Sequence, residues 1–355
     1  MEKLRFALLG CGRISKKHAE ALTALDEAQI VAVCDVDQAR AEKLGNKLKV
    51  PFYVDYDDML AKEAIDVVNI LTPSGLHAKH TTDVAVKYKK HIVCEKPMAL
   101  TLSDADRMIE ACKKNGAHLF VVKQNRYNLP VMKLKEAVIA KRFGKMVLGT
   151  VRVRWMRDQN YYDQDAWRGT WALDGGVFAN QAAHHIDLLQ WVMGEPEEVS
   201  AHITSRLVNI EAEDTGVAAI KFKNGALGVI EATTATRPKN LEGSISVLGE
   251  KGTVEIGGFA VNEMKLWEFS DDEKDKENLS EFKENPPNVY GFGHIRYLKD
   301  VIDCIKNGKG NPVDGKEGRK SLKFIISLYE SAEKGNPVRL SKALGHSKLG
   351  KLSGK

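Results

Sequence analysis

The sequence contains little that would indicate a disulfide framework or a thiolate metal site. Its 355 residues include five cysteines, an odd number, and no two of them form a Cys-x-x-Cys pair. Small disulfide scaffolds and zinc sites built from thiolates both depend on paired cysteine spacings. We therefore expect reduced thiols and a cytoplasmic protein. The cysteines are Cys11, Cys34, Cys94, Cys112 and Cys304.

Long hydrophobic runs and a strong excess of one charge are also missing. No stretch approaches the roughly 18 apolar residues that cross a bilayer, and the first residues lead into a strand pattern rather than a signal peptide. The 53 basic and 48 acidic residues leave a net charge of +5, a basic excess too small to favour nucleic-acid binding. We expect no membrane and no nucleic acid among the partners.

Short apolar, β-prone runs alternate with amphipathic stretches from residue 6 to residue 122. This alternation predicts βαβ units and a parallel, doubly wound sheet. The expected strands are Phe6–Gly10, Ile30–Asp35, Asp66–Leu71, His91–Cys94 and His118–Val122. The expected helices are Lys16–Leu25, Gln38–Leu48, His77–Tyr88 and Ser103–Asn115, the last with Ser103 as its N-cap. We predict an N-terminal Rossmann domain over residues 1–124, which makes this part of the fold α/β.

From residue 145 onward, longer alternating runs predict an open antiparallel or mixed sheet, and one helix is expected over Asn180–Met193. The expected strands are Val147–Trp155, Val199–Val208, Thr215–Lys221, Ala226–Thr234, Ser244–Leu248, Thr253–Ile256 and Met264–Phe269. The polar stretch Asp271–Glu284 predicts a solvated loop. We predict an α+β domain over residues 125–340 that binds substrate and forms oligomers, with helices at 295–333 packing back, and a disordered tail at 341–355.

A glycine-rich turn follows the first expected strand. In Gly10-Cys11-Gly12-Arg13-Ile14-Ser15, the glycines allow a tight turn and close approach of the backbone to a pyrophosphate at a helix start, while Ser15 replaces a third glycine. The second strand ends at Asp35, whose carboxylate would bind the ribose hydroxyls of NAD and repel the 2′-phosphate of NADP. The alternative is that Asp35 only caps the next helix, although Asp37 is also placed to do so.

Lys96 lies in Cys94-Glu95-Lys96-Pro97, at the carboxyl end of an expected parallel strand. Open α/β sheets bind their ligands at that edge, so a lysine there would point toward a ligand. Composition alone favours the alternative of a solvated surface lysine, because most lysines are exposed.

Four motifs resemble the glucose-fructose oxidoreductase/inositol dehydrogenase family in order and spacing. They are Gly10-x-Gly12, Thr72-Pro73-Ser74 with His77, Glu95-Lys96-Pro97 and Gln124-Asn125-Arg126. The resemblance covers nearly the whole chain and implies an NAD-dependent oxidoreductase whose motif lysine contacts substrate and nicotinamide, with a commonly cis peptide before the proline. The residues it assigns to NAD are Gly10, Gly12, Arg13, Ile14, Asp35, Thr72, Pro73, Ser74, His77, Glu95, Lys96, Gln124, Trp167 and Arg168.

The catalytic positions that the resemblance implies are Lys96 and His184. Oxidation of a secondary alcohol needs a base for the hydroxyl proton, a task that suits a histidine, and a neighbouring lysine would stabilise the developing alkoxide. Family members such as inositol dehydrogenase have an aspartate four positions before the histidine, where this chain has Asn180. On the expected helix Asn180 and His184 would share one face, and an asparagine cannot take up a proton.

The same helix raises the alternative of a metal site, because His184, His185 and Asp187 lie within four residues of one another. Adjacent histidines on a helix point about 100° apart, and no second cluster in the sequence completes a zinc set. We expect no metal, and a structural or dimer-facing role for His185.

Within the family, the sequence resembles the UDP-N-acetyl-D-glucosaminuronate 3-dehydrogenase group, for example in Trp167-Arg168-Gly169-Thr170-Trp171 and Glu213-Asp214-Thr215-Gly216. This implies oxidation of the sugar 3-hydroxyl by NAD, in surface-polysaccharide precursor synthesis, by a homo-oligomer, either a dimer or a tetramer. Arginines beside aromatic residues at 154–168 would suit a UDP-sugar, although ordinary strand packing gives similar runs. The residues assigned to substrate are Lys96, Arg157, Tyr162, Arg168, Asn180, Gln181 and His184.

Other functions stay open from the sequence. The scaffold could instead take UDP-N-acetylglucosamine or a free polyol such as inositol, and only the arginine-aromatic cluster argues against a polyol, which needs no diphosphate clamp. A different class is a non-catalytic NAD-binding sensor, and Lys96 and His184 argue against it.

Overall fold

The structure is a computed structural model that describes residues 2–270, 282–284, 291–310, 312–342 and 347–352. The chain divides into two compact units, residues 1–122 with 294–319 and residues 123–293 with 320–355. The sequence predicts residues 294–319 as part of the second domain, and the structure corrects this. This stretch belongs to the first unit because Phe120 pairs with Asp314 in a β-bridge, and Gly318 lies against Val121. Most of the loop expected at 271–284 lies outside the described residues.

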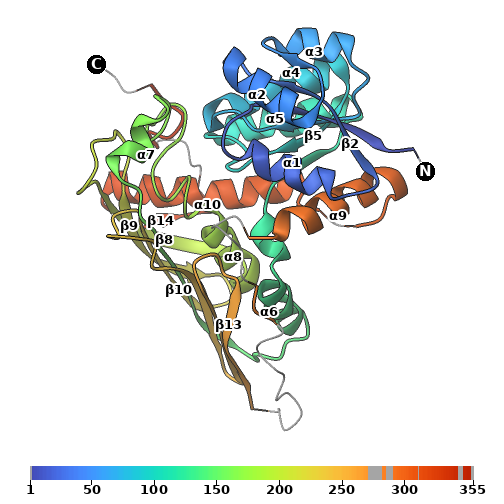
Figure 1. Ribbon diagram of the computed structural model, residues 1–355. Coiled ribbons are helices and arrows are strands. Elements are labelled where there is room, and N and C mark those ends of the chain that lie inside the picture. Colours follow the sequence, from blue (N-terminus) through green and yellow to red (C-terminus); the bar gives the residue numbers. More distant parts are fainter. Residues whose placement is uncertain (1, 271–281, 285–290, 311, 343–346, 353–355) are drawn as a thin grey trace. The chain divides into compact units, whose positions relative to one another are not determined.

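The first unit is a parallel sheet flanked by helices (Figure 1), as predicted. Its described strands follow the order β3-β2-β1-β4-β5-β6, in which the chain reverses direction across the sheet between β1 and β4. The strands are β1 Leu4–Leu9, β2 Ala28–Cys34, β3 Phe52–Tyr53, β4 Val67–Ile70, β5 His91–Cys94 and β6 Leu119–Val121. The helices are α1 Ser15–Thr23, α2 Gln38–Leu48, α3 Tyr56–Lys62, α4 His77–Asp83, α5 Leu102–Lys114 and α9 Gly293–Asn307, with single turns η1 Ser74–Leu76 and η2 Val84–Tyr88.

The core of this unit explains its continuous hydrophobic strands. Every residue of β4 is buried, which is the pattern of a parallel strand covered on both faces. The helix caps differ in one place from the prediction: α5 begins at Leu102, because the side chain of Thr101, not Ser103, accepts a hydrogen bond from the Asp104 N–H (3.1 Å). The short β3 and α3 were not predicted, since their apolar runs are too brief to show a period.

The second unit contains a mixed sheet in which the described strands follow the order β13-β12-β11-β7-β10-β9-β8-β14. They are β7 Met146–Arg154, β8 Pro196–Thr204, β9 Thr215–Phe222, β10 Leu227–Thr233, β11 Glu242–Gly249, β12 Gly252–Gly257, β13 Glu263–Phe269 and β14 Val338–Arg339. All seven expected strands are present, but β7 and β10 pair in parallel. Parallel pairing needs a long crossover, and here residues 155–226 supply it.

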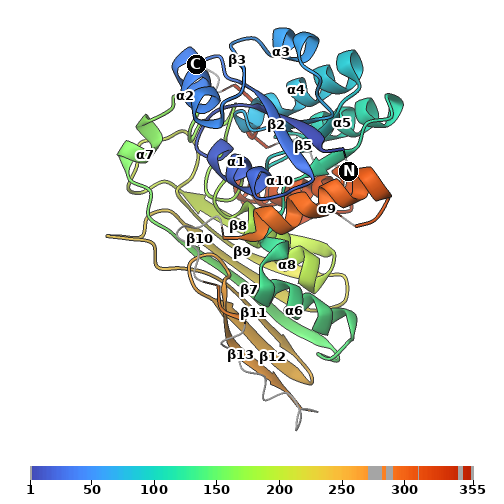
Figure 2. The same ribbon diagram turned by 45° about the vertical axis from the view of Figure 1, so that its right-hand side comes forward.

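Helices cover one face of this sheet. The helices of this unit are η3 Gln124–Tyr127, α6 Leu129–Ile139, α7 Gln159–Asp163, α8 Ala183–Met193 and the part of α10 (Gly315–Lys334) that belongs to it; α6 and α8 contact the strands directly. Figure 2 shows α6 and α8 against the strands β7, β11 and β12, in agreement with their contacts. Within the described residues, no helix combines the length and the apolar character needed to cross a membrane.

The tail expected to be disordered is packed in part, so that prediction is wrong for residues 347–350. Leu349 is 2% exposed, and the Gly350 N–H donates to the Trp171 carbonyl (2.8 Å). The stretch is polar and rich in glycine and lysine, and its single buried leucine gave no periodic signal.

Candidate active site

The phosphate turn directly follows β1, and its two glycines have different surroundings. Gly10 has a φ of +106°, and a Cβ there would lie 2.7 Å from the carbonyl carbon and oxygen of Leu71, so the turn needs glycine to pass the end of β4. Gly12 has nothing within 4 Å of an added Cβ. Open space beside the backbone at the start of α1 is what a pyrophosphate needs, so the turn fits the cofactor that the resemblance implies.

Asp35, at the end of β2, connects to the same turn. Its Oδ2 accepts a hydrogen bond from the Cys11 N–H (2.7 Å), and its Oδ1 accepts from the Asp37 N–H (2.9 Å). The cap of α2 is Asp37, whose side chain accepts from the Arg40 N–H (3.2 Å). The structure therefore decides against the alternative in which Asp35 caps α2, and it places the Asp35 carboxylate beside the phosphate turn, as a ribose-binding acid requires.

His77 joins two of the family motifs. Its Nε2 lies 2.8 Å from the Thr72 carbonyl oxygen and its Nδ1 lies 2.8 Å from the Pro97 carbonyl oxygen. Burial lowers the pKa of His77, while its contacts with these two carbonyl oxygens act in the opposite direction, because each oxygen can only accept a hydrogen bond from the ring. The side chain therefore holds the segment that begins Thr72-Pro73-Ser74 next to the Lys96-Pro97 peptide, which is cis.

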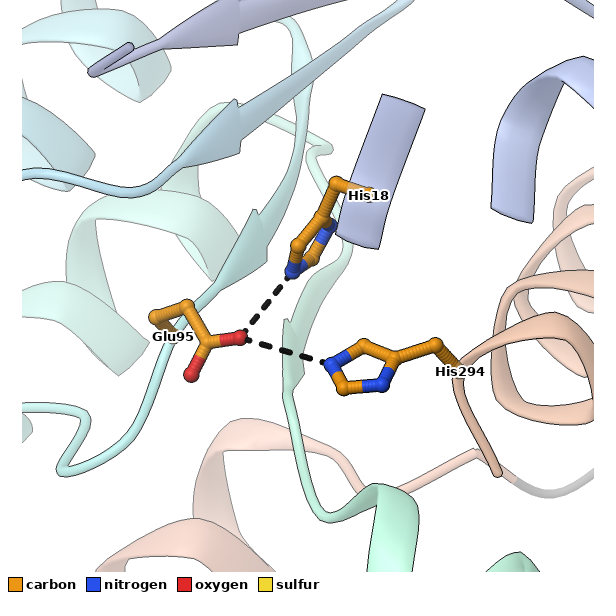
Figure 3. Close-up of side chains that lie close together, drawn as sticks. All are labelled: His18, Glu95 and His294. Atoms are coloured by element: carbon orange, nitrogen blue, oxygen red, sulfur yellow. Dashed lines mark hydrogen bonds and ion pairs between the residues drawn. The ribbon is translucent and has the colours of Figure 1, made fainter. Parts of the chain in front are cut away.

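Lys96 follows β5 and is half-buried, so it is not a fully solvated surface lysine. The preceding Glu95 is 6% exposed, and its Oε2 accepts a hydrogen bond from the Lys96 N–H (3.0 Å). Its Oε1 lies 3.0 Å from His18 Nε2 and 3.9 Å from His294 Nε2 (Figure 3). Burial by itself would raise the pKa of Glu95, but the contacts with His18 and His294 outweigh it and hold that pKa well below its usual range.

This His18–Glu95–His294 cluster has donor atoms within 4.8 Å of one another, as a metal site would. Hydrogen bonding accounts for it without an ion. The Asn69 amide, in the orientation observed, donates to His18 Nδ1 (2.9 Å), which makes Nε2 the protonated nitrogen that donates to Glu95. The result is a buried carboxylate that is held charged and fixes the Lys96 backbone.

In the second unit, His184 lies in the first turn of α8 and is 8% exposed. Its Nε2 is 3.0 Å from Gln124 Nε2. The resemblance assigned Gln124 to NAD, and no local pattern indicates its contact with His184, because the two residues are 60 positions apart. With the amide oriented as observed, Gln124 donates to a histidine nitrogen that carries a lone pair, the form a base requires.

Asn180 does not share a helix face with His184, so that prediction is wrong. Helix α8 begins at Ala183, and Asn180 lies in the turn before it, where its Nδ2 donates to Asp174 Oδ1 (2.5 Å). The apolar stripe used for the prediction starts only at Ile186 and could not place the helix start. Gln181, in the same turn, is 5% exposed.

The Asp187 carboxylate forms ion pairs with two basic residues, which take the place that a metal ion would need. Arg126 donates to both of its carboxylate oxygens (2.7 Å each), and Lys123 Nζ lies 3.5 Å away. These ion pairs tie η3 to α8 and so hold Gln124 against His184. His185 is fully buried with its ring edge-on to Trp155 (5.7 Å between centroids), and burial lowers its pKa to about 3. A neutral ring in an apolar site indicates a structural role for His185.

The arginine-aromatic cluster centres on Tyr161, which is not among the residues predicted to bind substrate. The guanidinium groups of Arg157 and Arg168 lie 5.2 Å and 4.6 Å from the centre of its ring. Its hydroxyl accepts from Arg168 (2.7 Å), which also pairs with Asp165 (3.1 Å) and lies 4.7 Å from the Trp167 ring. The adjacent tyrosines gave no basis in sequence for choosing between them.

The neighbouring Tyr162 points into the protein. It is 4% exposed, its hydroxyl lies 3.1 Å from Thr234 Oγ1, and burial raises its pKa. Arg154 is neutralised by Glu231 (2.5 Å) and Glu242 (3.0 Å). Arg157, by contrast, has no carboxylate partner among the described residues: it donates to the Met156 carbonyl (2.6 Å) and to Asn240 Oδ1 (3.3 Å).

The residues assigned from the sequence thus fall into two groups. The first unit carries Gly10, Gly12, Arg13, Ile14, Asp35, Thr72, Pro73, Ser74, His77, Glu95 and Lys96. The second unit carries Gln124, Arg157, Tyr162, Trp167, Arg168, Asn180, Gln181 and His184. The phosphate turn, Asp35 and Lys96 are therefore on the first unit, while His184 is on the second unit together with three residues assigned to NAD, which are Gln124, Trp167 and Arg168.

Two domain models of one known family match the chain, one before and one after residue 124. Residues 4–123 match the NAD-binding Rossmann fold of the oxidoreductase family Gfo/Idh/MocA, and residues 135–340 match its C-terminal alpha/beta domain. The chain belongs to this family. It is an NAD-dependent dehydrogenase, and the fold and cofactor predicted from the sequence are confirmed, while the sensor alternative is not supported by its dehydrogenase relatives.

Several relatives are similar over almost their full length. Myo-inositol 2-dehydrogenase from Thermotoga maritima is 31% identical over 351 residues, which are 96% of this chain and 100% of the relative. The WlbA dehydrogenase from Bordetella pertussis, solved in complex with NADH and UDP-GlcNAcA, is 44% identical with a TM-score of 0.91, covering 95% of this chain and 98% of that one. The WlbA dehydrogenase from Chromobacterium violaceum, solved with the same two ligands, is 43% identical with a TM-score of 0.90 and 96% coverage of both chains.

Proposed function

We propose that this family member oxidises the 3-hydroxyl of UDP-N-acetyl-D-glucosaminuronate to a ketone, with NAD as the hydride acceptor. The similarity to WlbA carries the proposal, because two dehydrogenases solved with NADH and UDP-GlcNAcA are 43% and 44% identical to this chain. The polyol dehydrogenase of Thermotoga maritima is 31% identical. The synthesis of surface-polysaccharide precursors would be the corresponding pathway.

The arginine-aromatic cluster supports a nucleotide sugar. Arg157 is a half-buried cation whose charge is not balanced by a carboxylate among the described residues, and it lies over the rings of Trp155 (5.5 Å) and Tyr161 (5.2 Å). An uncompensated guanidinium next to aromatic faces suits a diphosphate beside a base or sugar ring. A neutral polyol can accept hydrogen bonds from this guanidinium but offers it no opposite charge.

The proposed chemistry assigns one role to the cofactor and one each to His184 and Lys96. NAD supplies the acceptor for the hydride that leaves the carbon bearing the hydroxyl. His184 accepts the hydroxyl proton at Nε2, where Gln124 now donates a hydrogen bond, so the substrate hydroxyl takes the place of the amide. Lys96, fixed through Glu95, presents its ammonium group to the developing alkoxide. Asn180 and Gln181 orient the sugar from the turn before α8.

A substrate panel tests the proposal. UDP-N-acetyl-D-glucosaminuronate, UDP-N-acetylglucosamine and inositol are each incubated with enzyme and NAD while NADH absorbance is followed. A 2-oxo acid is added in parallel as an oxidant, in case NADH stays bound. Turnover with the uronate is expected. Turnover with inositol and with none of the UDP-sugars would refute the nucleotide-sugar assignment in favour of a polyol dehydrogenase.

Arg157 offers a sharper test of the same assignment. Loss of a charge-assisted hydrogen bond costs about 1.5–3 kcal/mol, so Arg157→Met should raise the KM for the UDP-sugar about 10- to 100-fold and leave the KM for NAD unchanged. Arg339→Met removes an exposed arginine paired with Glu198 on the same unit and serves as the control. An unchanged KM in Arg157→Met would contradict the diphosphate clamp.

We also expect a homo-oligomer, a dimer or a tetramer, formed through the open face of the sheet. Val217, Leu227 and Val229 are 46%, 56% and 40% exposed, and they alternate with buried residues on the strands β9 and β10. A group of exposed apolar side chains on adjacent strands is typical of an association surface.

A further inference from the structure

The segment that leads into α8 is held by an unusual set of hydrogen bonds. Two residues bind four consecutive backbone N–H groups, those of residues 176–179. The Tyr329 hydroxyl accepts from Gly176 (3.2 Å) and Ala179 (3.1 Å), while Glu213 accepts from Val177 with its carbonyl (3.0 Å) and from Phe178 with Oε1 (2.9 Å). The Tyr329 hydroxyl in turn donates to Glu213 Oε1 (2.8 Å).

This arrangement uses the full capacity of the tyrosine hydroxyl, which has one proton to donate and two lone pairs. It is also sealed from water, because Tyr329 is 0% exposed and Glu213 is 2% exposed. No side chain fits at Gly176, where a Cβ would lie 2.0 Å from Glu213 Oε2. The backbone at 176–179 therefore has one position relative to Glu213 and Tyr329.

The Glu213 carboxyl group acts here as a hydrogen-bond acceptor and not as a charge. Burial raises its pKa to about 8, and the nearby Asp174 adds to the shift, so the group is protonated at neutral pH. Burial also raises the pKa of Tyr329 well above its usual value. A neutral carboxyl accepts the Phe178 and Tyr329 hydrogen bonds without the cost of burying an unpaired charge.

The held segment determines where α8 begins. The helix has Ala182 as its N-cap and no side-chain capping bond, so its start is set by the chain before it. Asn180 and Gln181 follow the held residues directly, and His184 lies in the first turn. A displacement of residues 176–179 would therefore also displace Asn180, Gln181 and His184, the three residues of this segment that were assigned to substrate.

We propose that Glu213 and Tyr329 are positioning residues that set the substrate-facing segment Asn180–His184. The inference rests on the proposed oxidation by His184, and it does not depend on which sugar is the substrate. It predicts that the two residues control turnover of the alcohol substrate while the binding of NAD to the first unit is unaffected.

The test compares Tyr329→Phe, Glu213→Ala and Glu213→Gln in the full chain, using the substrate that gives the highest turnover with the wild type. Tyr329→Phe removes the acceptor of the hydrogen bonds that Gly176 and Ala179 donate, and a resulting displacement of about 1 Å should lower kcat about 10- to 100-fold. Glu213→Ala should behave similarly. Glu213→Gln keeps the accepting oxygen and should restore most of the lost kcat. Tyr297→Phe, at another fully buried tyrosine in the first unit, is the control.

Two further measurements separate positioning from general instability. The dissociation constant for NAD should stay within about twofold of the wild type. Hydrogen exchange should become faster at residues 176–182 and not across the whole second unit. Wild-type kcat in Tyr329→Phe, equal losses in Glu213→Gln and Glu213→Ala, or uniformly faster exchange would each overturn the inference. Failure of the wild type on every alcohol would instead contradict the proposed function.

Discussion

The two glycines of the phosphate turn should respond in opposite ways to the same substitution by alanine. Gly12 does not have a positive φ, and an added Cβ meets nothing within 4 Å. Gly12→Ala should therefore leave the unliganded fold intact. The free energy of unfolding should rise by about 0.4–1 kcal/mol, because alanine has less backbone freedom than glycine in the unfolded chain. The new methyl group occupies the space that the pyrophosphate needs. If the methyl group prevents two hydrogen bonds between the turn and the charged pyrophosphate, at about 1.5 kcal/mol each, the affinity for NAD falls about 100-fold.

Gly10→Ala should damage the fold instead. Its φ of +106° is strained for any residue with a side chain, and the Cβ would lie 2.7 Å from the Leu71 carbonyl group. Backbone strain costs about 1–3 kcal/mol, and the displacement of β4 adds about the same. The free energy of unfolding should fall by at least about 2 kcal/mol, which lowers the Tm by about 4 °C or more.

Thermal unfolding with and without NAD distinguishes the two effects. At NAD concentrations of about 100 times Kd, binding stabilises the wild type by about 2.7 kcal/mol. Without NAD, Gly12→Ala should melt slightly above the wild type, and it should show little further stabilisation when NAD is added. Gly10→Ala should melt earlier in both conditions. Wild-type affinity for NAD in Gly12→Ala would refute the role of this turn, and a wild-type Tm in Gly10→Ala would refute the steric argument.

Three other predictions concern the catalytic residues, the protonation of Glu213 and the exposed face of the second sheet. Lys96→Ala and His184→Asn should each abolish NADH production while isothermal titration still detects NAD binding; near-normal turnover in the double variant would contradict both catalytic roles. Folded Glu213 keeps its proton up to about pH 8, whereas the unfolded chain releases it near pH 4.5. Relative to Glu213→Gln, the wild-type free energy of unfolding should therefore fall by about 1.4 kcal/mol per pH unit across that window, as urea titrations would show; parallel curves would mean that Glu213 is ionised. Val229→Lys, on the exposed sheet face, should reduce the mass measured by light scattering, and an unchanged mass would exclude this face as the interface.

Much of the fold was predictable because it depends on local patterns. The alternation of short buried strands and amphipathic helices in the first 122 residues predicts a doubly wound sheet, and the order of the strands agrees. The turn at Gly10–Gly12 and the acid at Asp35 follow from the spacing of residues that bind a dinucleotide. The start of α8 was misplaced because the apolar stripe of the helix begins only at Ile186, and the bond from the Asn180 side chain to Asp174 leaves no local signal in the sequence.

Local sequence patterns were enough to predict the type of each long element, the cofactor motifs and the family. The tertiary structure decided which distant residues meet. His184 faces Gln124 across 60 positions, and Tyr329 bonds to Glu213 across 116. The period of apolar residues and the spacing of motif residues reflect which secondary structure the backbone prefers over a few residues. The pairing of buried polar groups depends instead on which surfaces pack together, because each such group must find its partner inside the protein.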